Sequence, residues 1–383
     1  MSVPSSPLPP SLLPAGFSDV LPPEAETEAA AIEAMLGVFA AHGYERVKPP
    51  LLEFEDSLLG GTGEATAEQT FRLMDPVSQR MMGLRADITP QVARIAAVRL
   101  ARAPRPLRLS YNGQVLRVRG SELRPARQMA QAGIELIGAD APEADAEVIA
   151  VAAEALAALG VPAVSFDLTL PTLADQLLAT LSLPAATDAA LRHALDRKDA
   201  AEVAAHAGPL ADVLDELLHA AGPADRALAA LAGSALPPAA AALAARLART
   251  VAAVRARAPG VALTADPLEF RGFRYHRGVA FTVFTGALSE ELGRGGGYLA
   301  GEEHATGVTL YPDVALRAAP PQPRRPRVFI PHGLGPQGAA LRRQGFATVA
   351  ALGPVKDARA EARRLACTHI ATDDGDASLL GGN

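Results

Sequence analysis

The residues best suited to chemistry lie between Arg108 and Gly138, where two apolar segments flank a loop rich in arginine. The loop arginines are Arg117, Arg119, Arg124 and Arg127. Guanidinium groups form charge-assisted, often bidentate hydrogen bonds with anions. A loop of this composition above a sheet is therefore suited to holding an anion.

The segment that follows the loop carries Gln131 and Glu135, four residues apart. Alternating apolar residues on both sides of the loop predict an antiparallel pair of strands. Residues an even number apart on a strand lie on the same face of the sheet. We therefore expect Gln131 and Glu135 to meet a small ligand on one face.

Asp87 and Thr89 stand just before a predicted helix from Gln91 to Arg102. One interpretation is structural, because aspartate and threonine often cap helices and Pro90 suits a first helical position. The other is functional, because a carboxylate and a hydroxyl together suit the ammonium group of an amino acid. These residues alone leave both interpretations open.

The composition indicates a globular protein of two or three domains, with 383 residues, 49% apolar and 20% charged. The net charge of -6 argues against a dedicated nucleic-acid binder. The single cysteine, Cys367, excludes an intramolecular disulfide and a cysteine-rich metal site. Only 3 of the 36 basic residues are lysines, so the abundance of arginine reflects general composition and only its placement is informative.

The remaining organisation follows from composition along the chain. Residues 1–15 lack the features of a signal peptide and predict a flexible tail. No segment is apolar enough to span a membrane, so we expect a cytoplasmic protein. Residues 171–258 are rich in alanine and leucine and predict a helical insertion, and residues 319–326 are a proline-rich linker. Residues 327–383 alternate strand and helix patterns, which predicts a small α/β unit.

Two glycine-rich segments stand out. Leu58 to Glu68 lacks the Gly-Lys-Ser/Thr of a phosphate-binding loop and predicts a mobile surface loop. Gly293 to Tyr298 lies in a predicted strand, where glycines either allow close approach of a ligand or mark a tight turn. A hairpin is expected around Asp75 and Pro76.

Taken in order, these segments resemble histidyl-tRNA synthetase-like proteins of the class II synthetase fold, over about Gly16 to Leu316. Leu84 to Thr89 matches the family's Leu-Arg-Pro-Glu-Gly-Thr segment, with Asp87 in place of glutamate. The other matching segments are Asp19 to Pro22 with Gly43 to Glu53 (the dimer-forming motif), Arg108 to Gly138 (the second motif and the histidine-reading strand), Arg271 to Phe281 (the histidine-specific segment) and Gly295 to Tyr298.

The resemblance implies an α+β protein, with a class II synthetase-like antiparallel sheet flanked by helices. The synthetase-like domain would span residues 16–318, with the helical insertion inside it. Residues 327–383 would then be a truncated remnant of the family's larger anticodon-binding domain, without a basic, aromatic face for reading RNA.

The departures from the synthetase pattern concern the nucleotide. Arg119 stands where a carboxylate would hold the adenine side of ATP, and Val314 where an arginine would clamp the phosphates. In the histidine segment Tyr275 is kept, while Arg274 and His276 replace an aspartate and a second tyrosine. Losing a phosphate clamp removes the main electrostatic stabilisation of a phosphate-driven reaction.

Synthetase-like proteins with such losses include the family of ATP phosphoribosyltransferase regulatory subunits. That resemblance implies a chain without catalytic activity, cofactor or metal, which activates a short-form catalytic subunit and carries feedback inhibition by histidine. It also implies a homodimer within a hetero-oligomer, with tRNA binding unlikely. The family's histidine site maps onto Asp87 and Thr89 for the ammonium, Arg117 and Arg271 for the carboxylate, and Gln131, Glu135 and Tyr275 around the ammonium and imidazole.

Three alternatives remain on the sequence alone. In the first, the chain would be an active histidyl-tRNA synthetase. In the second, it would be a synthetase-like enzyme that modifies another substrate, and in the third, a scaffold protein without a ligand. Without the order of the motifs, Gln131 and Glu135 would be an ordinary polar strand face and Arg271 a solvated turn residue.

Overall fold

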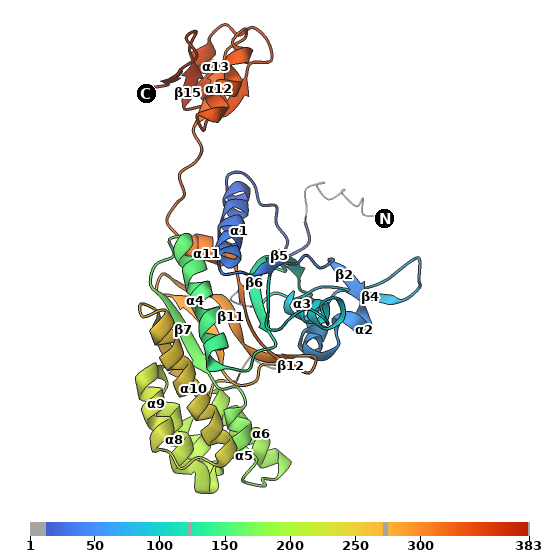
Figure 1. Cartoon of the computed structure of the whole chain (residues 1–383), viewed down its shortest axis with the longest axis vertical. Coiled ribbons are helices and arrows are strands. Elements are labelled where there is room, and N and C mark those ends of the chain that lie inside the picture. The colour runs from blue at the N-terminus through green and yellow to red at the C-terminus, as the bar shows by residue number, and fades with distance from the viewer. Residues whose placement is uncertain (1–12, 122–123, 271–274, 382–383) are drawn as a thin grey trace, which may run out of the picture. The chain divides into compact units, whose positions relative to one another are not determined.

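A computed structural model describes residues 13–121, 124–270 and 275–381 (Figure 1). The chain forms two compact units, residues 1–320 and 321–383, and each is described by itself. Among the described residues, no helix is long and apolar enough to cross a membrane. The predicted tail, residues 1–15, lies almost entirely outside the described residues.

The first unit is built on a nine-stranded sheet. Its strands, in spatial order, are β1 (Glu45–Arg46), β5 (Leu107–Leu116), β6 (Gln128–Ile137), β12 (Glu303–Leu310), β11 (Leu288–Ala300), β10 (Ala280–Thr285), β7 (Val164–Thr169), β9 (Ala262–Asp266) and β8 (Gly222–Pro223). Neighbouring strands are antiparallel except for the pairs β1–β5 and β7–β9, which are parallel. The sheet is therefore mixed, with an antiparallel centre.

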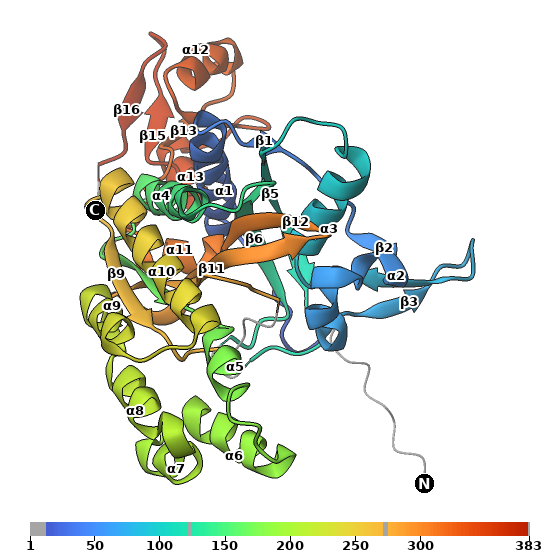
Figure 2. The same cartoon turned by 60° about the horizontal axis from the view of Figure 1, so that its bottom comes forward.

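One face of the sheet is covered by helices α1 (Glu24–Ala41), α4 (Pro142–Ala158), α10 (Pro238–Arg257) and α11 (Pro312–Ala318), as Figures 1 and 2 show. The alternation along β6 explains which of its side chains lie on each face of the sheet. Ala132, Ile134 and Leu136 belong to the large core beneath these helices. Gln131 and Glu135 point to the opposite face, as expected for a period of two.

The opposite face carries a smaller core and the short helix α3 (Thr89–Arg94), continued by a π-helical turn, η2 (Ile95–Arg99). A three-stranded sheet lies beside it, formed by β2 (Leu52–Phe54), β4 (Met81–Leu84) and β3 (Arg72–Met74), with helix α2 (Glu55–Leu58). The hairpin predicted around Asp75 is confirmed by β3 and β4, and the Asp75 N–H donates to the Arg80 carbonyl at 2.9 Å.

The prediction of a loop from Leu58 to Glu68 is wrong. Gly61–Gln69 forms a 3₁₀-helix, η1, and Gly63 is buried in it. A Cβ atom at Gly63 would lie 2.0 Å from the carbonyl oxygen of Leu58. Here the glycine allows two parts of the chain to pack closely. A glycine-rich composition is equally typical of a mobile loop, so composition alone cannot distinguish the two.

Six helices lie between β7 and β9. They are α5 (Leu173–Leu178), α6 (Ala185–Asp196), α7 (Ala200–His206), α8 (Ala211–His219), α9 (Ala224–Gly233) and α10, with the 3₁₀ turn η3 (Gly208–Leu210) before α8. Pro184, Pro223 and Pro237 each stand immediately before a helix. Proline suits the start of a helix, because an N–H group at that place would have no acceptor within the helix.

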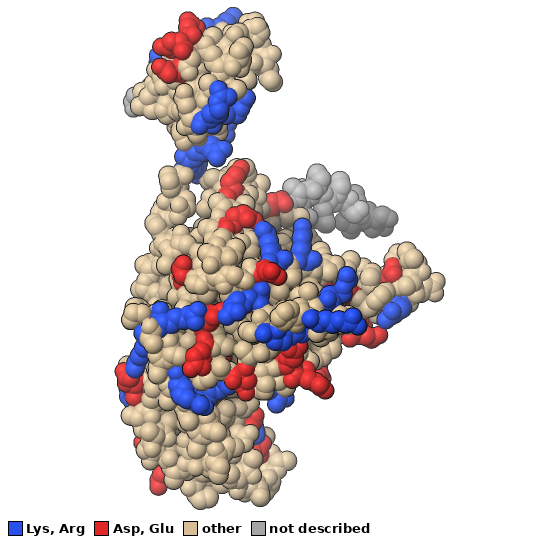
Figure 3. All heavy atoms as spheres, viewed as in Figure 1, with Lys and Arg blue, Asp and Glu red and all other residues tan. Residues whose placement is uncertain are grey.

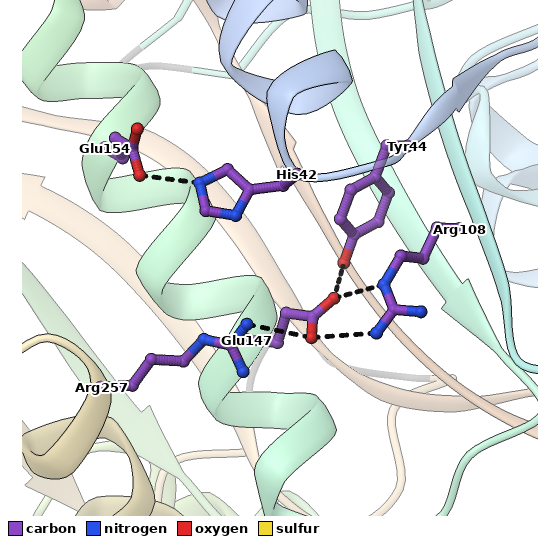
Figure 4. A network of polar contacts seen from close by, with 6 residues as sticks. All are labelled: His42, Tyr44, Arg108, Glu147, Glu154 and Arg257. Atoms are coloured by element: carbon purple, nitrogen blue, oxygen red, sulfur yellow. Dashed lines mark hydrogen bonds and ion pairs between the residues drawn. The ribbon is translucent and has the colours of Figure 1, made fainter.

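A polar network joins the turn after α1 to β5, α4 and α10 (Figure 4). Glu147 of α4 accepts hydrogen bonds from the Tyr44 hydroxyl at 3.2 Å, from Arg108 Nε at 2.7 Å and from Arg257 Nη2 at 3.2 Å. Burial alone would raise the pKa of Glu147, but Arg108 and Arg257 outweigh it and lower that pKa. The network therefore binds the last helix of the insertion to the sheet through one buried carboxylate.

Replacing Glu147 by alanine should lower the free energy of unfolding by about 2 kcal/mol, because the buried Tyr44 hydroxyl loses its acceptor and two arginines lose their partner. This loss of stability is moderate because the side chains of Arg108 and Arg257 are 35% and 44% exposed, so water screens their interaction with Glu147. The control is Glu154→Ala. Glu154 lies on the same helix as Glu147 and is the exposed partner of His42, so its loss should change stability by less than about 0.5 kcal/mol. Urea unfolding measures both, and equal losses would contradict this account.

The second unit is a small α/β fold with a sheet in the order β14 (Ala347–Ala350), β13 (Arg327–Ile330), β15 (His369–Ala371), β16 (Ala377–Leu379). Strand β13 is parallel to both of its neighbours. Helices α12 (Gly338–Arg343), preceded by the 3₁₀ turn η4 (Gly335–Gln337), and α13 (Ala358–Arg364) complete it. Phe329 and Leu341 are fully buried in its two apolar clusters.

Candidate functional site

A cavity of about 350 Å³ opens on the face of the large sheet that carries α3. Its lining residues are Ala65, Thr66, Gln69, Asp87, Arg117, Ser121, Gln131, Tyr275, His276, Glu291, Arg294, Thr309 and Tyr311. A smaller hollow shares Tyr275, His276, Arg294 and Thr309 with it and adds Glu135. Strands β6, β11 and β12 supply the floor, and η1 and the loop after β5 supply the walls.

Glu135 is the most constrained group of the site, with 1% of its surface exposed. Its Oε1 accepts hydrogen bonds from the Thr89 hydroxyl at 2.8 Å and the Tyr111 hydroxyl at 3.2 Å. Its Oε2 accepts one from the Tyr298 hydroxyl at 2.9 Å. Burial raises the pKa of Glu135 to about 8, and these hydroxyls oppose that rise.

Gly307 makes room for this carboxylate. It is the residue of β12 paired with Glu135, and a Cβ atom there would lie 1.8 Å from Glu135 Oε2. The glycine is required by close approach, since no side chain fits between the carboxylate and the neighbouring strand.

The capping interpretation of Asp87 and Thr89 is wrong. Helix α3 begins at Thr89, and the preceding Ile88 makes no side-chain cap. The Thr89 hydroxyl is instead committed to Glu135, and the Asp87 side chain lines the cavity. The Oδ1 atom of Asp87 is buried and accepts no hydrogen bond from any described residue. A buried acceptor of this kind is suited to a ligand that brings its own donors.

Gln131 and Glu135 lie on the same face of β6, as predicted. The Gln131 Oε1 atom accepts a hydrogen bond from the Ile88 N–H at 3.1 Å, and Glu135 accepts one from the next residue, Thr89. The two side chains therefore hold the start of α3 against the sheet, with Gln131 at the cavity and Glu135 at the adjoining hollow.

The arginine-rich loop does not act as one anion cradle. Of its four arginines, only Arg117 lines the cavity. Arg124 donates twice to the Asp313 carboxylate, both at 2.7 Å, and its guanidinium lies 4.5 Å from the centre of the Tyr311 ring. Arg127 stacks on two phenylalanines, and Arg119 is exposed. The sequence of the loop identifies the arginines, but it does not predict their partners, which lie elsewhere in the chain.

Tyr275 lies at the cavity, stacked on His276 with ring centres 4.3 Å apart and edge-on to Tyr298 at 6.1 Å. Burial, followed by the charge of Arg294, lowers the pKa of His276 to about 3, so its imidazole is neutral at physiological pH. Arg271 and Arg274, the other residues predicted in this segment, lie outside the described residues.

Sequence reasoning missed several residues of the cavity wall. Thr66 and Gln69 come from η1, which was expected to be a surface loop. Glu291 and Arg294 come from β11, where the arginine stands within the glycine-rich run that was noted for close approach. The glycines of β11 could have indicated that its neighbouring residues line a cavity, because glycines in a strand often mark where another group approaches closely.

Comparison with known proteins places this geometry in a family. The sequence model described as histidyl-tRNA synthetase matches residues 16–314. A protein of Paramagnetospirillum magneticum described as an ATP phosphoribosyltransferase regulatory subunit is 56% identical, covering 95% of this chain and 97% of its own. A protein of Gluconobacter oxydans with the same description is 55% identical, covering 95% and 96%.

Solved structures agree on the fold. A Bacillus halodurans protein described as an ATP phosphoribosyltransferase regulatory subunit/histidyl-tRNA synthetase superposes with a TM-score of 0.77 at 22% identity, covering 92% of this chain and 96% of the other. Histidyl-tRNA synthetase from Nostoc gives 0.76 at 17% identity, covering 94% and 91%. The predicted α+β, class II synthetase-like fold is confirmed. The chain belongs to the family of ATP phosphoribosyltransferase regulatory subunits, built on the histidyl-tRNA synthetase fold.

Proposed function

We propose that this chain is a non-catalytic regulatory subunit that binds histidine in the cavity described above. It activates a short-form ATP phosphoribosyltransferase catalytic subunit, and bound histidine suppresses that activation. The reaction of the partner would be the first step of histidine biosynthesis, so the ligand is the end product of the pathway.

The observation that carries the proposal is the set of polar groups at the cavity. Asp87 offers a buried oxygen to a ligand donor, Arg117 offers a cation, and Glu135 lies in the adjoining hollow. In the proposed complex Asp87, Thr89 and Gln131 lie around the ammonium of histidine, Arg117 and Arg271 at its carboxylate, and Glu135 and Tyr275 near its imidazole.

Two features of the described residues argue against a working nucleotide half of a synthetase site. Val314, which stands where the synthetase pattern has an arginine, is fully buried in the large core. The adjacent Asp313 is occupied by Arg124. Losing one bidentate, buried charge contact costs about 2 to 5 kcal/mol. These features support the proposal that the chain has no aminoacylation activity of its own.

Charges on the face seen in Figure 3 are mixed in sign over the sheet domain and sparse over the helical insertion. An extended field of one sign, which favours polyanion binding, is not visible on that face. On this face, the mixed charge favours a protein partner over tRNA. We propose a cytoplasmic homodimer within a hetero-oligomer that contains the catalytic subunit.

Titration calorimetry with L-histidine tests the ligand. Binding of one histidine per chain, to the subunit alone or to its complex with the catalytic subunit, is expected. The sensor role fails if neither preparation binds histidine at millimolar concentration.

The second candidate is a histidyl-tRNA synthetase, favoured only by the fold that the chain shares with such enzymes. It requires histidine-dependent ATP–pyrophosphate exchange. We expect none, with a known synthetase as the positive control, and exchange above the blank would restore this candidate.

A further inference from the structure

Gln69 closes one side of the cavity from the C-terminal end of η1. Its Oε1 atom is buried and accepts no hydrogen bond from the residues that the structure describes. Among the cavity-lining residues, Asp87 shares this property through its Oδ1 atom. Buried acceptors without donors are rare in folded proteins, and two in the wall of one cavity indicate a donor that arrives with the ligand.

Backbone contacts hold the segments of Gln69 and Asp87 close to Arg117. The carbonyl of Gln69 accepts a hydrogen bond from the Val118 N–H at 2.9 Å, next to Arg117. The Arg117 Nε reaches the Ala86 carbonyl at 3.5 Å, next to Asp87. The Arg85 carbonyl also accepts from the Leu116 N–H at 3.0 Å, which ties the same two segments together. All three side chains line the same cavity.

The chemistry of the two atoms selects the ligand group. An amide oxygen and a carboxylate oxygen accept hydrogen bonds and donate none when the carboxylate is ionised. A primary ammonium group has three donors and no acceptor, so one such group carries enough donors for both oxygens. A carboxylate could not, because it would meet two acceptors, and Arg117, which lines the same cavity, is its better partner.

We propose that Gln69 is a further ligand-binding residue, which accepts a hydrogen bond from the α-ammonium group of the bound amino acid together with Asp87. The site thereby requires a free primary amine. This inference rests on the proposed function, since it assumes that the cavity binds histidine, and it adds a specificity-determining residue from η1.

The test measures three ligands by calorimetry on full-length chain: L-histidine, histamine, which lacks the carboxylate, and 3-(imidazol-4-yl)propionate, which lacks the ammonium. Gln69→Leu keeps the size of the side chain and removes the acceptor. We expect affinity for histidine and histamine to fall by roughly 10- to 100-fold, as for a lost hydrogen bond to a charged group. Affinity for imidazolylpropionate should stay within about twofold of wild type, since the lost acceptor faces only the ammonium.

Gln69→Glu restores an acceptor and should recover the histidine affinity that Gln69→Leu loses. Gln176→Leu, on the exposed face of α5, is the matched control and should change none of the three affinities. The inference is overturned if Gln69→Leu binds histidine within about twofold of wild type, or loses all three ligands equally without rescue by Gln69→Glu. In both cases histidine binding by the wild type leaves the proposed function standing. A wild-type chain that binds none of the three ligands, either alone or in complex with the catalytic subunit, overturns both.

Discussion

Gly307→Ala should destabilise the protein by about 3 kcal/mol and abolish measurable histidine binding. The new methyl group would lie 1.8 Å from Glu135 Oε2 and 2.8 Å from the Ile134 carbonyl oxygen, so the carboxylate or the strand must move. Overpacking of a buried site costs about 1 to 3 kcal/mol, and the displaced carboxylate also loses its hydrogen bond from Tyr298. Thermal or urea unfolding measures the first effect and calorimetry the second.

Gly37→Ala is the matched control, because it is the same chemical change where the structure has room. Gly37 is exposed within helix α1, and a Cβ atom there meets nothing within 4 Å. Alanine is the better helix former, so this variant should gain about 0.5 to 1 kcal/mol and bind histidine normally. If both variants behave alike, Gly307 does not serve close approach to Glu135.

Glu135→Gln should weaken histidine binding by about 10- to 100-fold at pH 8, because a neutral amide replaces the carboxylate beside the proposed imidazole position. The substitution keeps the size of the side chain, so the loss should appear without a large change in stability. Gln176→Leu again serves as an exposed control. Unchanged affinity in Glu135→Gln would place the imidazole elsewhere.

The same residue should make binding depend on pH. The pKa of Glu135 is about 8 in the folded protein, against about 4.3 in an unfolded chain. Its contribution to stability is therefore complete below about pH 4.3 and is lost as the pH rises through 8. Histidine binding changes in the opposite direction, because an imidazole N–H donor favours the ionised carboxylate.

Affinity for histidine should therefore rise by up to about tenfold per pH unit between about pH 7 and 8, where the ligand imidazole is mostly neutral. His276 contributes nothing to this range, since its pKa is lowered to about 3. Calorimetry in buffers of different ionisation enthalpy should show a proton released on binding. Glu135→Gln should show neither the slope nor the release, and a flat profile in the wild type would contradict the assignment.

The sequence patterns predicted what depends on local periodicity. Alternation along residues 128–137 was sufficient to place Gln131 and Glu135 on one face, because the period of two is a property of the strand itself. The fold class followed from the order of several motifs. The hairpin around Asp75 followed from turn residues between two short apolar runs.

What the patterns did not predict depends on contacts between distant segments. The three hydroxyls that hold Glu135 come from α3, β5 and β11, which no local pattern brings together. Arg124 finds its partner 189 residues along the chain, so the loop could not be recognised as pinned to α11. Thr89 looked like a helix cap because its actual partner, Glu135, lies far along the chain on strand β6. Gln69 was hidden in a segment whose glycines indicated a loop.

The most direct test of the central claim is an activity assay of the reconstituted complex. The chain is purified with a short-form ATP phosphoribosyltransferase catalytic subunit, and formation of phosphoribosyl-ATP is followed with and without L-histidine. We expect the catalytic subunit to be markedly more active with the chain than alone, and histidine to suppress the added activity. The account is contradicted if excess chain leaves the activity of the catalytic subunit unchanged, or if millimolar histidine has no effect on the activated complex.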